Sequence, residues 1–200
     1  MGTSQGFILL KNNGFTPETL RERMTRRPAP SEEEAWLLRV TGAPHRSPEV
    51  VAFREDAAWL PYFEGWRCEG CFCSGRELRE LSERFAVPAL AFFHCDSDVL
   101  FLSYCDAAAQ IVYDYAKPNC PDLSEYDLSG CQQETPMFLL SLNGENGAPN
   151  LEEARRLKEI WNEEGLIFSD DRMEHLLGLL DMQVMYVEED IPNGFTRVSL

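Results

Sequence analysis

The chain has 200 residues, of which 44% are hydrophobic and 26% are charged, and this ordinary globular composition excludes disorder of the whole chain. Asp and Glu total 34 against 18 Lys and Arg, so the formal net charge is −16. A negative field of this size repels nucleic-acid phosphates and anionic membrane surfaces and attracts basic proteins. We therefore expect a basic protein partner, and neither nucleic acid nor a membrane surface.

The N-terminal segment predicts a strand followed by a helix. Residues 4–13 (SQGFILLKNN) form a short apolar run that ends in turn residues, which is typical of a strand. Thr16 is a candidate N-cap, and Pro17 stands at the first helical position. Arginines gather toward the end of this helix, where the helix dipole favours positive charge.

The next segment is ambiguous and then becomes strand-like. Ser31 and Glu34 fit a capping box for a short turn of helix. Residues 35–42 (AWLLRVTG) either extend that helix or form a strand. Residues 48–56 and 57–66 predict two strands joined by a polar turn.

The second half of the chain predicts a clear helix, three strands and a helical C-terminal part. The clearest helix covers 74–86, because leucines and a phenylalanine recur there at spacings of three and four. Three strands follow, over 89–95, 98–105 and 109–117. A long loop over 117–136 then covers an edge or a pocket. The last elements are a strand or short helix over 137–142, helices over 151–165 and 169–182, and a strand over 183–190.

This order of elements predicts an α+β fold with a mainly antiparallel sheet and helices packed on one side. Residues 16–64 and 75–117 both read as a helix followed by strands, which suggests a degenerate α-β-β-β duplication. We treat 1–200 as a single domain, with 1–67 and 68–200 as its alternative halves.

The chain shows neither a secretory signal nor an apolar run of membrane-spanning length. Seven cysteines in such a chain favour reduced thiols over a disulfide framework. We expect a cytoplasmic protein.

Two stretches resemble a known group of proteins. Residues 77–115 (ELRELSERFAVPALAFFHCDSDVLFLSYCDAAAQIVYDY) contain an LS…PALAF…DSDVL core, and 168–182 (FSDDRMEHLLGLLDM) read as a closing helix. This pattern resembles uncharacterised bacterial α+β proteins associated with toxin-immunity functions. The resemblance implies a fold and a class of binding protein, and it carries no catalytic residue to this chain.

Residues 65–75 (GWRCEGCFCSG) are the densest chemical stretch. Cys68 and Cys71 have the Cys-x-x-Cys spacing of zinc sites, and Cys73 could supply a third thiolate ligand. The fourth ligand would come from a distant residue, either His94, Cys95, Cys105, Cys120 or Cys131. A redox pair placed between a strand and a helix, or a loop of unligated thiols, fits the same residues.

A second candidate site lies near the turn of Asp96 and Asp98. Together with His94, Asp114 and Tyr115, these carboxylates could bind a cation, do acid–base chemistry or line a pocket under the 117–136 loop. The alternative is a solvated hairpin turn, in which Asp is favoured by its geometry.

Aromatic residues before the cysteine loop offer a third candidate. Trp59, Tyr62, Phe63 and Trp66 either pack in the core or form an exposed rim that anchors a protein partner. We rank an acidic, non-enzymatic protein-binding module of the immunity or antitoxin type first. A zinc-binding protein and an enzyme of unknown class are the alternatives.

Overall fold

The structure is a computed structural model that describes residues 5–30, 32–40, 48–64, 75–95, 98–106, 112–118, 128–142, 151–163, 169–179, 191 and 193–200. Within these ranges, none of the helices combines the length and the apolar character needed to cross a lipid bilayer. The strands are β1 (Gln5–Lys11), β2 (Glu49–Phe53), β3 (Trp59–Glu64), β4 (Ala89–Cys95), β5 (Val99–Cys105), β6 (Val112–Pro118) and β7 (Thr196–Ser199). The described helices are α1 (Pro17–Thr25), α2 (Glu32–Val40), α4 (Gly75–Phe85), α5 (Leu139–Leu142), α6 (Leu151–Asn162) and α7 (Ser169–Leu179).

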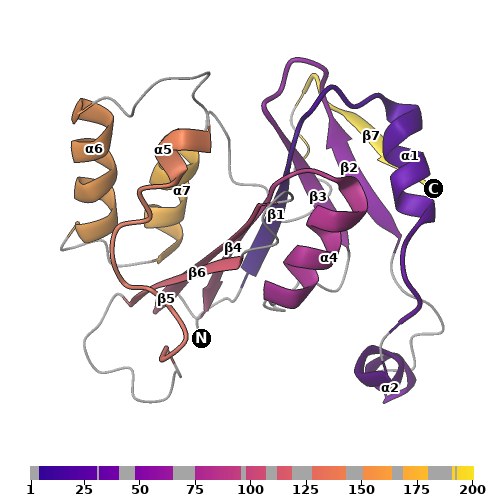
Figure 1. Ribbon diagram of the computed structural model, residues 1–200, viewed down its shortest axis with the longest axis horizontal. Helices are drawn as coiled ribbons and strands as arrows, with labels where there is room; N and C mark the ends of the chain where they lie inside the picture. Colours follow the sequence, from indigo (N-terminus) through magenta and orange to yellow (C-terminus); the bar gives the residue numbers. More distant parts are fainter. Residues whose placement is uncertain are drawn as a thin grey trace.

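The seven strands form one sheet in the order β6-β5-β4-β1-β3-β2-β7, and every neighbouring pair is antiparallel (Figure 1). The first strand, β1, lies in the centre, between β3 and β4. The sheet therefore contains strands from both of the halves into which the sequence could be divided. The α+β class and the antiparallel sheet predicted from the sequence are confirmed.

Helices cover both faces of the sheet, whereas the sequence analysis placed them on one side. Ile8 and Leu10 pack with side chains of α1 and α4, while Phe7 and Leu9 pack with side chains of α5, α6 and α7. Successive side chains of a strand point to opposite faces, so a strand that is apolar at every position needs a cover on both sides. The run FILL in β1 is such a strand, and Figure 1 shows the two groups of helices on either side of the sheet.

The segment after β6 closes that edge of the sheet. The amide of Gln132 donates to the carbonyl of Asp114 at 2.8 Å, and the carbonyl of Gln132 accepts from the amide of Ala116 at 2.9 Å. Tyr115 and Gln132 thus form a parallel bridge. This part of the 117–136 loop covers an edge, which is one of the two roles predicted for it.

Local sequence signals explain most of the element boundaries. Thr16 caps α1 in a capping box with Thr19, and Pro17 takes the first helical position as predicted. Residues 35–40 continue α2, which settles the strand-or-helix ambiguity of that segment as helix. The described residues of 16–64 therefore contain two helices and two strands, and this order differs from the helix and three strands described over 75–118.

Two further expectations concern the C-terminal part. The run 137–142 forms the short helix α5 at its end. The predicted strand over 183–190 lies outside the described residues. The strand β7 pairs with β2 at the other edge of the sheet and was not predicted from the sequence.

Candidate functional site

Two glutamates are buried opposite each other at one end of neighbouring strands. Glu49 begins β2 and Glu64 ends β3, and the two residues are register partners. Their side chains are 2% and 1% exposed. Because side chains alternate along a strand, Glu64 shares a face with Tyr62, which belongs to the core layer under α1 and α4.

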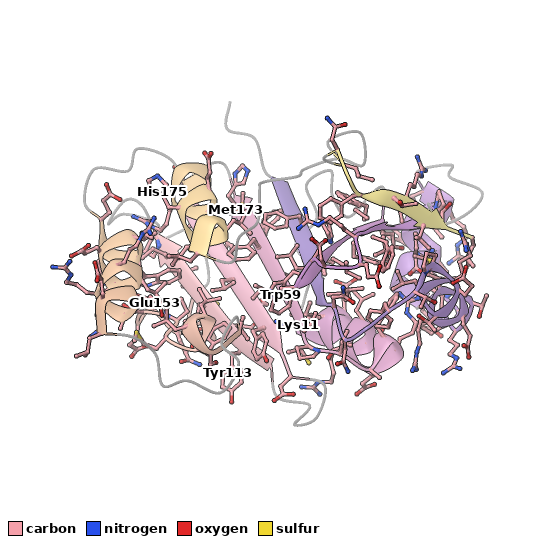
Figure 2. All side chains as sticks on the ribbon, turned by 90° about the horizontal axis from the view of Figure 1, so that it is seen from above. Lys11, Trp59, Tyr113, Glu153, Met173 and His175 are labelled. Atoms are coloured by element: carbon pink, nitrogen blue, oxygen red, sulfur yellow. The ribbon has the colours of Figure 1, made fainter. Side chains whose placement is uncertain are left out.

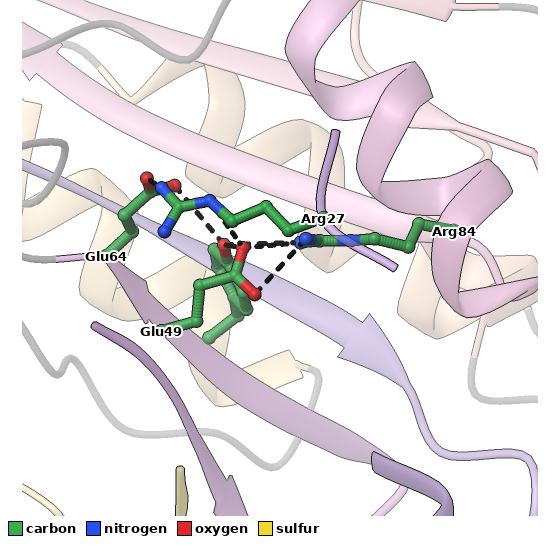
Figure 3. Close-up of polar contacts among 5 residues, drawn as sticks. Arg27, Glu49, Glu64 and Arg84 are labelled. Atoms are coloured by element: carbon green, nitrogen blue, oxygen red, sulfur yellow. Dashed lines mark hydrogen bonds and ion pairs between the residues drawn. The ribbon is translucent and has the colours of Figure 1, made fainter. Parts of the chain in front are cut away.

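Two arginines and a tyrosine surround these carboxylates (Figure 3). Arg84, in the last turn of α4, donates two hydrogen bonds to Glu49, from Nη1 to Oε2 at 3.1 Å and from Nη2 to Oε1 at 2.6 Å. Arg27, two residues beyond α1, lies with its Nε 3.4 Å from Oε1 of Glu49, and its Nη2 pairs with Glu64. The Tyr62 hydroxyl donates to Glu49 at 2.6 Å and lies 3.2 Å from Glu64. We call Arg27, Glu49, Tyr62, Glu64 and Arg84 the buried ion cluster.

The buried ion cluster is balanced in charge. It contains two carboxylates and two guanidiniums, so burying it leaves no net charge in the interior. Burying a carboxylate is costly unless it is paired and hydrogen-bonded, and both conditions are met here. The cluster ties the ends of α1 and α4 to the sheet, which is a structural role.

Beyond Arg27, the chain leaves the body of the protein. Pro28, Ala29 and Pro30 are exposed, and proline fixes an extended backbone in such a segment. They lead to α2, which lies apart from the sheet and the other helices (Figure 1). The side chains of Trp36 and Val40 in α2 are exposed large hydrophobic groups, with 55% and 58% of their surface accessible.

The aromatic rim predicted from the sequence is not at the surface. Trp59, Tyr62 and Phe63 are buried, at 0%, 1% and 3% exposure, while Trp66 lies outside the described residues. The reason is that β3 lies between β1 and β2 and is covered on both faces. These three residues are core residues, and the proposed binding role for them is corrected.

The second predicted site is divided by the sheet. His94 lies on the same side of β4 as Phe92, which packs under α5–α7, and Tyr115 packs in that layer too. Asp114 lies on the opposite face, where it accepts a hydrogen bond of 2.5 Å from Ser103. The structure therefore does not bring His94 and Asp114 into one pocket. Asp98 lies just before β5, and Asp96 is outside the described residues.

The layer under α5 holds a cluster of aromatic rings that the sequence analysis did not single out. Tyr104 of β5 stacks against Tyr113 of β6, and the Phe138 ring lies 4.8 Å from that of Tyr104. Burial, with the nearby Asp106 charge as the second cause, raises the pKa of Tyr104 to about 12. The alternating aromatics of β6 are the signal that could have identified this cluster, because they face one side of a strand.

A lysine lies at the other end of α5. The Lys11 ammonium donates to the carbonyl of Leu142 at 2.7 Å and lies 5.0 Å from the centre of the Trp59 ring (Figure 2). Burial lowers the pKa of Lys11. These contacts fasten α5 to the central strand β1.

The cysteine loop with Cys68, Cys71 and Cys73 lies outside the described residues. Among the residues that are described, no group of three or more His, Cys, Asp or Glu side chains could hold a metal ion. Cys105 is a buried free thiol whose pKa is raised by burial, so its thiolate is disfavoured. The zinc site stays a prediction.

Comparisons with known proteins add no relative. No protein-family model, no curated protein and no solved structure matches the chain.

Proposed function

We propose that this protein is a non-enzymatic, acidic protein-binding module of the immunity or antitoxin type that engages a basic protein. The observation that carries the proposal is the location of its charge. The buried ion cluster is neutral as a unit, so other residues carry the net charge of −16.

Many of those acidic side chains are exposed, and some of them also pair with a basic side chain of the protein. They come from helices and turns on both sides of the sheet: Glu18, Glu22, Glu32, Glu55, Asp56, Glu80, Glu83, Glu134, Glu152, Glu153, Glu159, Glu163 and Glu174. A surface of this kind speeds association with a positively charged protein and selects against acidic ones.

The arrangement of the buried carboxylates also favours binding over catalysis. Both oxygens of Glu49 accept hydrogen bonds from Arg84. Glu64 is paired with Arg27. A general base has to accept a proton from a substrate, and these groups are instead engaged by fixed cations in the interior. His94, Asp98 and Asp114 do not share one pocket that could serve as a catalytic site, because the sheet separates His94 from Asp114.

The test is capture of a partner by the immobilised full-length chain, followed by measurement with the purified partner. We expect the affinity to fall as the salt concentration rises, because screening weakens contacts between exposed charges. Reversing exposed acids, for example Glu163→Lys with Glu174→Lys, should weaken binding more than the corresponding Gln variants. A partner that binds equally well in high salt and to the reversed variant contradicts the proposal.

A further inference from the structure

The nine-residue helix α2 turns its largest apolar side chain away from the protein. Glu32, Trp36 and Val40 are four residues apart and are all exposed, so they share the outer face of the helix. Ala35 and Leu38 lie on the other side and are half-buried. A surface helix normally directs its apolar stripe to the core, so an exposed Trp next to an exposed Val indicates an interaction surface.

The chain is anchored to the body of the protein shortly before α2. Arg27 is fixed in the buried ion cluster through Glu49 and Glu64. Pro28 and Pro30, which follow it, restrict the backbone of that segment.

The charge of α2 indicates which kind of partner could bind to its outer face. Its sequence begins with three consecutive glutamates and contains one basic residue, Arg39, which is exposed and lies on the same face as Trp36, one turn after it. Three negative charges against one positive charge leave the helix acidic overall. Glu32 precedes Trp36 by one turn, and an indole ring beside a carboxylate is a combination that receives a guanidinium or ammonium group.

Three of the four arginines at the end of α1 are paired with carboxylates, which compensates their charge, whereas Arg23 keeps its positive charge. Arg21 lies 4.0 Å from Glu18, Arg26 pairs with Glu22, and Arg23 donates to the carbonyl of Arg84 at 3.5 Å. Arg27 belongs to the buried ion cluster.

We infer that the outer face of α2, formed by Glu32, Trp36 and Val40, is the docking site for a cationic segment of a protein partner. An Arg or Lys side chain of the partner stacks on Trp36 and pairs with Glu32, while an apolar side chain packs on Val40. This inference deepens the proposed function and rests on it, because it assigns the surface that the basic partner contacts.

The experiment uses a fluorescein-labelled peptide that contains arginines and leucines, and its control is the same peptide with glutamates in place of the arginines. Fluorescence anisotropy with the full chain should show binding of the cationic peptide alone, weakening with salt. Trp36→Ala and Glu32→Lys should each weaken it roughly tenfold, which corresponds to a cation–π contact or a charged hydrogen bond. Leu151→Ala is the matched control, because Leu151 is an exposed apolar residue on α6, outside the proposed face, and it should leave binding unchanged.

The outcomes separate the inference from the proposed function. If Trp36→Ala binds the peptide like the wild type while Glu163→Lys with Glu174→Lys weakens binding, the docking face is wrong and the acidic module stands. If the wild type shows no salt-sensitive binding of the cationic peptide, the docking face for a cationic segment is wrong, and the salt dependence of the captured partner decides the proposed function separately. Sedimentation equilibrium gives the third outcome: a dimer that Trp36→Ala dissociates would show that a second copy of the chain occupies the face, which overturns the inference.

Discussion

Glu49 and Glu64 face each other across β2 and β3, and the guanidinium of Arg27 contacts both carboxylates. Two like charges at opposite positions of a strand pair would repel each other without such a bridge. The pairing of these strands therefore depends on residues contributed by the end of α1 and the end of α4.

Removing one arginine from the buried ion cluster should destabilise the protein strongly. Arg84→Met removes the guanidinium that donates two hydrogen bonds to the buried carboxylate of Glu49. We expect the free energy of unfolding, measured with urea, to fall by about 3–5 kcal/mol. Arg155→Met is the control, because Arg155 and Glu159 form an exposed pair that contributes less than about 1 kcal/mol. Equal losses in the two variants would contradict a structural role for the cluster.

The raised pKa of Tyr104 makes stability depend on pH in the alkaline range. The folded protein holds the phenol proton up to about 12, whereas an unfolded chain releases it near the ordinary value of about 10. The contribution is therefore fully present below pH ~10 and is lost as the pH rises toward ~12. Ultraviolet absorbance of the phenolates should show a late titration step, and Tyr104→Phe should reduce its amplitude; the remainder belongs to Tyr115, whose pKa is also raised by burial. A titration of Tyr104 at the ordinary value would refute the burial of its hydroxyl.

Replacing glycine with alanine should have opposite effects on stability at Gly6 and Gly178. A Cβ atom at Gly6 would lie 2.8 Å from the backbone carbonyl oxygen of Phe92, so Gly6→Ala should cost about 1–3 kcal/mol through overpacking. At Gly178 in α7 a Cβ atom would meet no neighbour, and Gly178→Ala should stabilise the helix by up to about 1 kcal/mol. Thermal unfolding of both variants tests the placement of β1 against β4. A neutral Gly6→Ala would mean that the two strands are farther apart.

One buried and one exposed tryptophan provide a further test. Trp161 is fully buried and donates to the carbonyl of Gln133 at 3.0 Å, so Trp161→Ala should cost about 3–5 kcal/mol. Trp36→Ala should change the free energy of unfolding by less than about 0.5 kcal/mol, because its side chain is mostly in solvent. A large loss at Trp36 would show that this residue packs against the body of the protein, and the docking face would be excluded.

Mass spectrometry can distinguish a zinc site from a loop of unligated thiols at the cysteine loop. If Cys68, Cys71 and Cys73 bind zinc, native spectra of protein purified without chelator should show the mass of one ion, which denaturation removes. Cys68→Ser should then lower both metal content and stability. A native mass equal to that of the bare polypeptide would identify the segment as a loop of unligated thiols.

The local signals in the sequence predicted most of the elements correctly. The apolar runs at 7–10 and 89–93 identified two strands, and the spacing of Leu78, Leu81 and Phe85 identified α4, whose three residues are all buried. The strand β7 was not predicted because Val198 is its one buried position, so its sequence shows no alternation of apolar and polar residues.

The candidate site was less accessible to sequence reasoning. The buried ion cluster joins residues of β2, β3, α4 and the segment that follows α1, and nothing local to Arg27 or Arg84 indicates that they meet two glutamates on β2 and β3. A weak signal was available in the form of Glu64 at the end of an otherwise apolar strand. The outer face of α2 was also ambiguous, because consecutive apolar residues from Ala35 to Leu38 leave the buried side of the helix undetermined.

The central position of β1 has a consequence for how the protein is made. β1 precedes the other strands of the sheet in the chain, and its neighbours β3 and β4 begin only at Trp59 and Ala89, so the strand gains both partners after these later segments are made. Among the described strands, β1 links β3-β2-β7 to β6-β5-β4, so removal of Gln5–Lys11 would leave two three-stranded sheets. We therefore expect β1 to complete the sheet late in folding, and its removal should expose two new strand edges that promote aggregation.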